Sequence, residues 1–409
     1  MTAGRGTLLL VVLAVGWLGA NLLNADDVHL SSGYHFLVLA LLAVGLYGST
    51  REIELQELRG NFRTVLLAIS VGVLAKVALI SGVMYLFYRE PASLVLGVAV
   101  AQIDPLAVAA AQGRKRMSAS TRAVLNSWAA FDDPVTVLLT IYLSMFALQA
   151  QGVGTPATAG SPTVTFLLNL LLNLAFAAVA FAGWLAARRT GLAGWLASAT
   201  VAARIGQVAV AVVVLGYAAL GVAGSLMLGI AMVGLFFRPY ARWKRTAENV
   251  LLYALLVATG ALGVVLAGTA DMVTAVTVLK GVLLGCAAYG AQMVAGRLLS
   301  RKRDRLDRLY LTLSQQNGLT AIVLALALEP DFPGAVAVIA PAIVVTNVLY
   351  ALGSRYVGTV ETRVVDEEER VARLKAKIPA TPCLDGIIES RVRSARAAAP
   401  SRRAPGTAS

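Results

Sequence analysis

The amino-acid sequence predicts an all-α polytopic membrane protein with about twelve transmembrane helices. Of the 409 residues, 58% are hydrophobic and only 14% are charged. Soluble domains carry about a quarter charged residues, so this composition excludes a large soluble domain. Apolar runs of about twenty residues, the length that crosses a bilayer core, recur up to about residue 353. The loops between these runs are alternately basic and almost free of basic residues, which is typical of membrane proteins.

The expected spans follow directly from the apolar runs. We place them at residues 7–23, 33–50, 62–88, 92–112, 122–148, 163–187, 194–216, 222–237, 248–267, 272–299, 306–329 and 334–353. The first run has a signal-like apolar core, but no convincing small-residue cleavage site follows, so we interpret it as a retained helix. A very short turn between Gly216 and Gly224 must join the seventh and eighth spans.

The basic residues indicate how the spans are oriented. If the amino terminus is cytoplasmic, each inward loop is basic, ending with a cluster from Arg297 to Arg308. The outward loops hold one basic residue, Arg89. This positive-inside pattern predicts that both termini are cytoplasmic. The net charge of +13 is then a topology signal with at most an attraction to anionic lipid, and we expect no nucleic-acid partner.

Near the carboxyl terminus the composition changes. Residues 365–377 place acidic before basic residues, as a short exposed helix would, and residues 395–409 are almost all Ala, Arg, Pro and Ser. We therefore expect a transmembrane domain, residues 1–354, and a largely disordered cytoplasmic tail, residues 355–409. Neither the two cysteines nor the two histidines are spaced for a disulfide framework or a metal cage, so we expect no cofactor.

Few ionisable residues remain inside the spans, and these are functional candidates because a charge in lipid is costly. They are Lys76, Asp104, Asp132, Asp133, Arg204 and Lys280. Arg204 lies towards the cytoplasmic end of its span and is expected to snorkel to the interface. Lys76 lies near the middle of its span, where snorkelling explains it poorly.

The fourth span contains AQIDPLAVAAA, in which Asp104 precedes Pro105. Proline removes a backbone donor and disfavours the helical conformation of the residue before it, so the helix should break near Ile103 and Asp104. Non-helical backbone at membrane depth requires surrounding protein or a water-filled cavity. Asp104 could cap the second half-helix, and it could at the same time form part of an ion site, as in the broken helices of transporters.

The fifth span contains SWAAFDDPVTVLL, with adjacent Asp132 and Asp133. Successive helix positions differ by about 100°, so the two carboxylates should face different neighbours. Both cannot stay ionised in a buried site without partners, and one should bind protons more readily. Alternation between a proton and a metal cation is the chemistry of an antiporter. The alternative, two solvated helix caps, is disfavoured because ten residues separate Asp132 from Arg122.

Lys280 lies eight residues into the tenth span and needs a carboxylate or a cavity there. Asp132 is the expected partner, while pairing of Asp132 with Lys76 and snorkelling of Lys280 to the outer interface remain open. The eleventh span begins LSQQNGLTAIVLALALEP. Its polar run, residues 314–318, indicates either a second interrupted helix or a polar helix start near the cytoplasm.

In order and spacing, the segments from Leu37 to Ser354 resemble the monovalent cation–proton antiporter superfamily, the sodium/hydrogen exchangers. AQIDPLAVAAA is similar to its "T-D-P-x-A" broken helix, SWAAFDDPVTVLL to its "A-A-x-x-D-D" helix, and SQQNGLTAIVLALAL to its second broken helix. GVAGSLMLGIAMVGLFF resembles a helix of its dimer-forming domain. The resemblance implies an inverted-repeat antiporter fold, in which two broken helices cross in a core domain beside a separate dimerisation scaffold. The core helices would be about 62–148 and 272–353, and the scaffold about 7–50 and 163–267.

The resemblance also implies roles for the site residues. Asp133 would bind the transported cation, Na⁺, and the proton, and Asp132 and Asp104 would complete this site. Lys280 would compensate the charge of Asp132. Possible supporting residues are Lys76, Ser127, Gln316 and Asn317.

Some positions depart from the family pattern. Paired aspartates resemble the electrogenic branch, whereas the electroneutral branch has Asn-Asp and often an arginine where Asn317 stands. Ile103 replaces a threonine that is a possible cation ligand, and Pro134 stands where a small or branched residue is usual. These two departures leave the identity of the cation open.

We therefore expect a homodimeric secondary antiporter of the plasma membrane, exchanging Na⁺, or alternatively Li⁺ or K⁺, for H⁺ by alternating access. A sodium-coupled symporter of an organic anion is the alternative, although Lys76 and Lys280 alone make no obvious anion cavity. An intramembrane aspartyl protease could use Asp104 and Asp133, but the chain lacks the Gly-x-Gly-Asp of that family. A sensor without transport is a third class.

Overall fold

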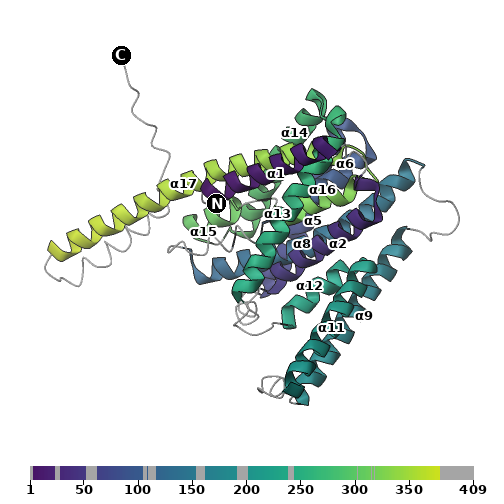
Figure 1. The fold of residues 1–409 in the computed structure, drawn as a ribbon. Coiled ribbons are helices and arrows are strands. Elements are labelled where there is room, and N and C mark those ends of the chain that lie inside the picture. Colours follow the sequence, from purple (N-terminus) through teal and green to yellow (C-terminus); the bar gives the residue numbers. More distant parts are fainter. Residues whose placement is uncertain are drawn as a thin grey trace.

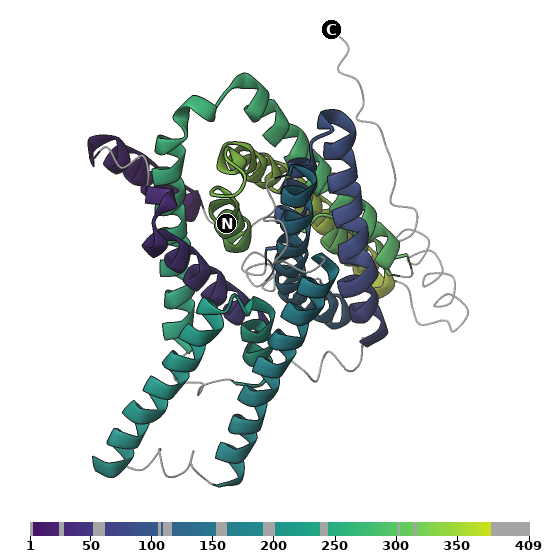
Figure 2. The ribbon, with the colours of Figure 1, turned by 90° about the vertical axis from the view of Figure 1, so that its right-hand side faces the viewer.

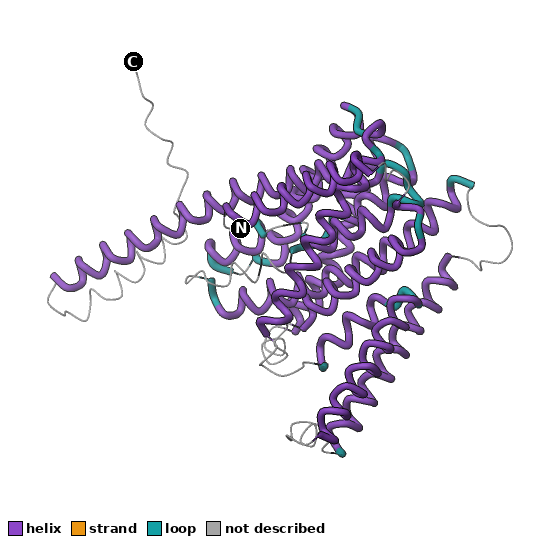
Figure 3. Tube along the Cα trace, in the orientation of Figure 1, coloured by secondary structure: helices purple, strands orange, loops and turns teal. Residues whose placement is uncertain are grey.

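The computed structural model describes residues 3–23, 28–51, 62–104, 108, 117–152, 162–190, 201–237, 244–301, 303–314, 316 and 318–377. Over these ranges the chain folds into helices joined by short connections, as Figures 1 and 3 show. Because a helix satisfies its own backbone hydrogen bonds, it is the element expected for apolar segments that cross lipid.

The α-helices are α1 (Ala3–Leu23), α2 (Ser32–Arg51), α4 (Phe62–Leu67), α5 (Val73–Tyr88), α6 (Pro91–Ala99), α8 (Ala119–Ala150), α9 (Pro162–Arg189), α11 (Val201–Ala223), α12 (Met227–Phe236), α13 (Lys244–Gly268), α14 (Ala275–Leu299), α15 (Arg305–Thr312), α16 (Leu319–Leu328) and α17 (Ala335–Lys377). A π-helical turn, Ala68–Gly72, joins α4 to α5. Two 3₁₀ turns, Val28–Leu30 and Ala270–Met272, precede α2 and α14.

Seven helices in the described part of the chain are long and apolar enough to cross a membrane. Further apolar helices are shorter, among them α12 and α16. The fourth and eleventh expected spans are interrupted, as predicted, so no single long helix covers either of them in the described part of the chain. α8, in contrast, runs through Pro134 as one helix.

The turn between the seventh and eighth expected spans lies later than predicted. α11 continues through Gly216 to Ala223, and the chain reverses around Ser225, which has a φ of 52°. Glycine inside a helix costs only about 1 kcal/mol relative to alanine. In lipid this cost is outweighed because no water competes for the backbone hydrogen bonds, so Gly216 does not end the helix.

The last helix is also longer than predicted. α17 passes the expected domain boundary at residue 354 without a break and includes residues 365–377, which were expected to form a separate helix. No proline interrupts the chain between these positions, so nothing in the local chemistry stops the helix. Figure 1 shows its end extending beyond the other helices. The remainder of the tail, residues 378–409, lies outside the described residues.

The helices that surround the centre of the molecule pack in a continuous chain of contacts. α5 packs against α6 and α14, α6 packs against α8, and α14 packs against α17. α2 contacts α8 and α16 and also α12 and α13, while α1 lies along α13. Figures 1 and 2 show α9 and α11 at the edge of the molecule. Many leucine and valine side chains of α9 and α11 are exposed, as expected for helices that face lipid.

Candidate functional site

Two interrupted helices meet in the middle of the bundle. The first is interrupted after α6, which ends at Ala99. The second is interrupted between the end of α15 at Thr312 and the start of α16 at Leu319. Between α6 and α8, and between α15 and α16, the backbone is non-helical at the two predicted places. Ile103 and Gln316 form an isolated antiparallel bridge, so the two non-helical segments lie side by side. Both predicted helix breaks are therefore present.

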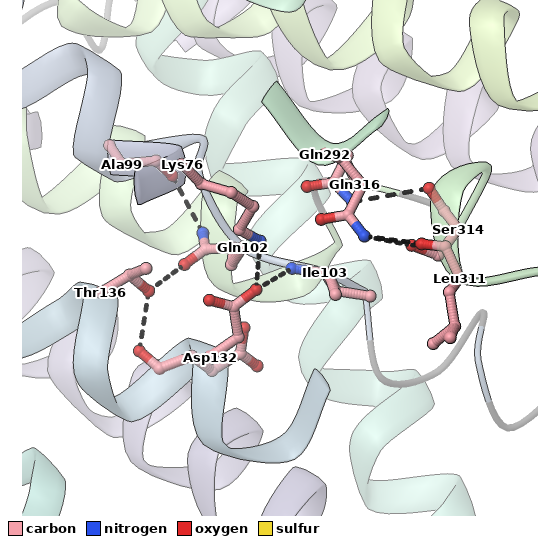
Figure 4. A network of polar contacts seen from close by, with 11 residues as sticks. Lys76, Ala99, Gln102, Ile103, Asp132, Thr136, Gln292, Leu311, Ser314 and Gln316 are labelled. Carbon is pink, nitrogen blue, oxygen red and sulfur yellow. Dashed lines mark hydrogen bonds and ion pairs between the residues drawn. The ribbon is translucent and has the colours of Figure 1, made fainter. Parts of the chain in front are cut away.

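Buried amide side chains bind the carbonyl ends of both broken helices. The Nε2 atom of Gln102 donates to the Ala99 carbonyl at 2.9 Å. The Nε2 atom of Gln292 donates to the Leu311 carbonyl at 3.0 Å and to the Ser314 hydroxyl at 2.9 Å. Figure 4 shows the two networks on either side of the crossing. Because the last carbonyls of a helix lack intrahelical partners, these amides satisfy groups that would otherwise be buried alone.

Lys76 lies against Asp132 at this crossing. The Nζ atom of Lys76, from α5, forms an ion pair with Oδ2 of Asp132, from α8, and both side chains are fully buried. The same carboxylate oxygen accepts the backbone N–H of Ile103 at 3.0 Å. The Lys76 ammonium also lies 5.3 Å from the ring centroid of Trp128, one helical turn before Asp132. Position 103 thus contributes its backbone N–H, which isoleucine supplies as well as threonine.

The prediction that Lys280 compensates Asp132 is wrong. The Nζ atom of Lys280 lies 3.0 and 3.2 Å from the two carboxylate oxygens of Glu90 and 4.7 Å from the ring centroid of Tyr88. The side chains of Lys280 and Glu90 are 18% and 55% exposed. Lys280 lies in the second turn of α14, and its long side chain reaches the end of the helix instead of the bundle centre.

Asp133 faces other neighbours, as expected for the next helix position. It is 2% exposed. Its Oδ2 atom accepts the hydroxyl of Thr320 at 2.9 Å, whereas its Oδ1 atom has no hydrogen-bond partner among the described residues. The Thr136 hydroxyl lies 2.9 Å from the Asp133 backbone carbonyl and 2.7 Å from Oε1 of Gln102. One oxygen of a deeply buried carboxylate is therefore open to a proton or a cation.

Asp104 lies in the non-helical segment that follows α6. A Cβ atom at Gly318 would be 2.5 Å from both Cγ and Oδ1 of Asp104, so the carboxylate rests on the backbone of Gly318. Gly318 is the N-cap of α16 and provides no side-chain cap. A helix amino terminus attracts negative charge, so Asp104 complements α16. Only glycine leaves room for this contact.

The comparisons with known proteins agree with this arrangement. The sequence model of the family described as "Sodium/hydrogen exchanger, transmembrane" matches residues 7–359. The chain belongs to this family. A solved structure of the sodium proton antiporter MjNhaP1 from Methanocaldococcus jannaschii at pH 8 has a TM-score of 0.56 and 16% identity, over 84% of this chain and 92% of that chain. An electron-microscopy structure of the same antiporter has a TM-score of 0.51 and 17% identity, over 86% of this chain and 88% of that chain. No curated protein sequence matches the chain.

Family membership fixes the class of function. The chain is a multi-pass membrane transporter of the cation/proton antiporter type and not an enzyme, which removes the aspartyl protease from consideration. At identities of 16% and 17% the structural likeness supports the fold and leaves the cation and the roles of individual residues open.

The remaining predicted site residues are placed only in part. Ser127 is buried on α8, and Gln316 is buried at the crossing with its Oε1 atom lacking a hydrogen-bond partner in the described part of the chain. Asn317 lies outside the described residues, as does the side chain of Arg204. The structure thus brings Asp104, Asp133 and the Lys76–Asp132 pair together.

Sequence reasoning overlooked several polar residues of the site. These are Gln102, Trp128, Thr136, Gln292 and Thr320. The two glutamines carried a usable signal, because an amide in the middle of an apolar span needs a partner. The threonines carried none, because a threonine can satisfy its hydroxyl on its own helix.

Proposed function

We propose that this exchanger carries a monovalent cation, Na⁺ in the first place and Li⁺ or K⁺ as alternatives, in exchange for H⁺, and that both ions compete for Asp133. The observation that carries the proposal is the different state of the two adjacent carboxylates. Oδ2 of Asp132 has a buried lysine as its partner, while Oδ2 of Asp133 has only the Thr320 hydroxyl, and Oδ1 of each carboxylate has no hydrogen-bond partner among the described residues.

Competition follows from the cost of burying charge. An ionised carboxylate in a low-dielectric site is strongly unfavourable unless a positive charge neutralises it. Because Lys76 neutralises the charge of Asp132, Asp133 must bind either a proton or a cation to neutralise its own charge. Asp104 lies near enough to add negative charge to the same site, and carboxylate and amide oxygens are suitable ligands for hard cations. The open Oε1 atom of Gln316 supports this ligand set.

We infer that Asp132 acts differently from the role first expected. Its Oδ2 atom is bound by Lys76 and by the backbone N–H of Ile103. We therefore infer that Asp132 stabilises the structure of the site as a neutralised partner of Lys76 and is not a cation ligand. Removing one member of such a pair would leave a buried charge alone, which is strongly destabilising.

We further infer alternating access by movement of the core helices, about 62–148 and 272–353, against a scaffold of about 7–50 and 163–267 in an inverted-repeat fold. α2 of the scaffold contacts α8 and α16 of the core, and the Tyr34 hydroxyl donates to the Leu326 carbonyl at 2.9 Å across this contact. The distribution of basic residues supports a plasma-membrane protein with both termini cytoplasmic. A homodimer with a role in pH homeostasis would suit this architecture.

The purified protein in proteoliposomes with an acidic interior tests the proposal. External Na⁺, Li⁺, K⁺ and Rb⁺ are added in turn, and the internal pH is followed with an entrapped dye. We expect alkalinisation of the interior by at least one of these cations, with Na⁺ the most effective. No response to any of them would contradict antiport, and a response that requires an organic anion would support the symporter instead.

A further inference from the structure

Among the described residues, Thr320 is the polar side chain that joins Asp133 to the second broken helix. We propose that the Thr320 hydroxyl oxygen is a ligand of the transported cation, so that the cation is bound jointly by α8 and α16. This inference rests on the proposed role of Asp133 as the exchange site.

The geometry places the hydroxyl where a ligand is needed. Thr320 lies in the first turn of α16, is 4% exposed, and donates to Oδ2 of Asp133 at 2.9 Å. A hydroxyl has one hydrogen and two acceptor lone pairs. After the bond to Asp133, both lone pairs of the Thr320 oxygen remain. Among the described residues no donor contacts this oxygen, so it is available to a cation without breaking its bond to the carboxylate.

Other oxygen atoms converge on the same region. The open Oδ1 atom of Asp133 belongs to the carboxylate that Thr320 contacts. The carboxylate of Asp104 rests on Gly318, two residues before Thr320. Hard monovalent and divalent cations prefer several oxygen ligands, and this arrangement offers carboxylate and hydroxyl oxygens from three chain segments.

Among the described residues, the position of α2 that lies beside Thr320 is a glycine, Gly45. A Cβ atom on Gly45 would be 4.0 Å from the hydroxyl oxygen of Thr320. The charged groups that act on Asp133 are Asp104, Asp132 and Lys76. A substitution at Thr320 leaves all three in place, so its effect reports on the hydroxyl itself.

The pH dependence of the apparent KM for Na⁺ distinguishes a hydroxyl that only orients Asp133 from a hydroxyl that binds the cation. Loss of a donor to a carboxylate favours its protonated form. A hydroxyl that only orients Asp133 would therefore affect the apparent KM for Na⁺ when protons compete and have no effect at alkaline pH. A lost ligand weakens cation binding at every pH, because it is missing whether or not protons compete.

The test measures the apparent KM for Na⁺ in proteoliposomes from neutral to alkaline pH. Thr320→Val removes the hydroxyl at nearly constant volume, Thr320→Ser retains it, and Thr320→Ala is the second variant if valine impairs folding. Thr259→Val is the matched control, since Thr259 is a buried threonine of α13 whose hydroxyl bonds only the Leu255 carbonyl of its own helix.

We expect KM to rise about tenfold in Thr320→Val at all pH values, as loss of one interaction with a charged group of roughly 1.5 kcal/mol implies. Thr320→Ser and Thr259→Val should stay near the wild-type KM. A normal KM at alkaline pH, or throughout, would overturn the ligand role. Asp133→Asn in the same liposomes separates the two proposals. If this variant exchanges ions normally, the proposed function fails. If it is inactive while Thr320→Val has a normal KM, only the ligand role of Thr320 is refuted.

Discussion

The two helix interruptions solve the same backbone problem with different side chains. At each one, a buried glutamine binds the carbonyl end of a broken helix: Gln102 at Ala99 and Gln292 at Leu311. At the second interruption, the groups that Gln292 contacts, the Leu311 carbonyl and the Ser314 hydroxyl, are neutral. Around the first lies a buried ion pair, Lys76–Asp132 (Figure 4). The next residue, Asp133, is buried as well.

The difference shows which groups the fold needs and which it tolerates. A neutral amide is sufficient to satisfy the carbonyl end of a broken helix, as Gln292 demonstrates at the second interruption. Buried ion pairs contribute little net stability, because desolvation offsets the attraction between the charges. We therefore propose that the charges at the first interruption serve ion exchange. Their removal should affect transport and stability differently from changes at the second interruption.

The largest effect is expected at Asp133. Asp133→Asn keeps the size of the side chain and its bond to Thr320 but removes the charge for which protons and cations compete. Cation-dependent proton movement in proteoliposomes should be abolished, while gel filtration shows a folded protein. Exchange near the wild-type rate would show that the open carboxylate is not the site.

The next effect is on stability at the Lys76–Asp132 pair. Lys76→Ala or Asp132→Ala alone leaves one buried charge and should lower the free energy of unfolding by about 3–5 kcal/mol. The double variant should recover much of this loss, because no orphan charge remains. A double-mutant cycle on thermal unfolding in detergent measures this coupling. Strictly additive losses would mean that the two residues do not support each other.

A smaller effect is expected at the neutral interruption. Gln292→Leu removes the donor to the Leu311 carbonyl and the Ser314 hydroxyl. The unpaired buried groups should cost about 1–3 kcal/mol. Since no charge is involved, the apparent KM for Na⁺ should stay near the wild-type value. A loss of cation affinity as large as that of an Asp133 variant would remove the distinction between the two interruptions.

The smallest effect should come from the second lysine. The Lys280–Glu90 pair is partly exposed, and exposed ion pairs contribute about 0–1 kcal/mol. Lys280→Ala should therefore melt within a few degrees of the wild type. The change in melting temperature of the Lys280→Ala, Asp132→Ala double variant should equal the sum of the changes in the two single variants. Coupling between these two substitutions would reinstate Lys280 as the partner of Asp132.

Sequence reasoning predicted the interruptions because their causes are local. Asp104–Pro105 and the polar run at 314–318 each disfavour a continuous helix within a few residues. The pairing of Asp132 required knowledge of which helices are neighbours. The sequence shows how far along its span each of Lys76 and Lys280 lies. It does not show that α5 packs beside α6 and α8, and this packing brings Lys76 to the carboxylate of Asp132.

The remaining differences also have physical causes. The turn at Ser225 was placed too early because Gly216 is a helix breaker in water but is tolerated in lipid. α17 exceeds its predicted end because composition changes at residue 355 without any backbone signal that stops a helix. The contact of Thr320 with Asp133 links residues 187 positions apart, which no local pattern reveals.

Calorimetric titration of Na⁺ into the purified protein tests the competition for Asp133 most directly. Performed at one pH in two buffers with different heats of ionisation, it yields the number of protons released as the cation binds. Binding of a cation to a protonated ligand displaces that proton, so the account predicts proton release on binding in the wild type and loss of binding and release together in Asp133→Asn. Na⁺ binding without proton release at a pH where transport is active, or unchanged release in Asp133→Asn, would contradict it.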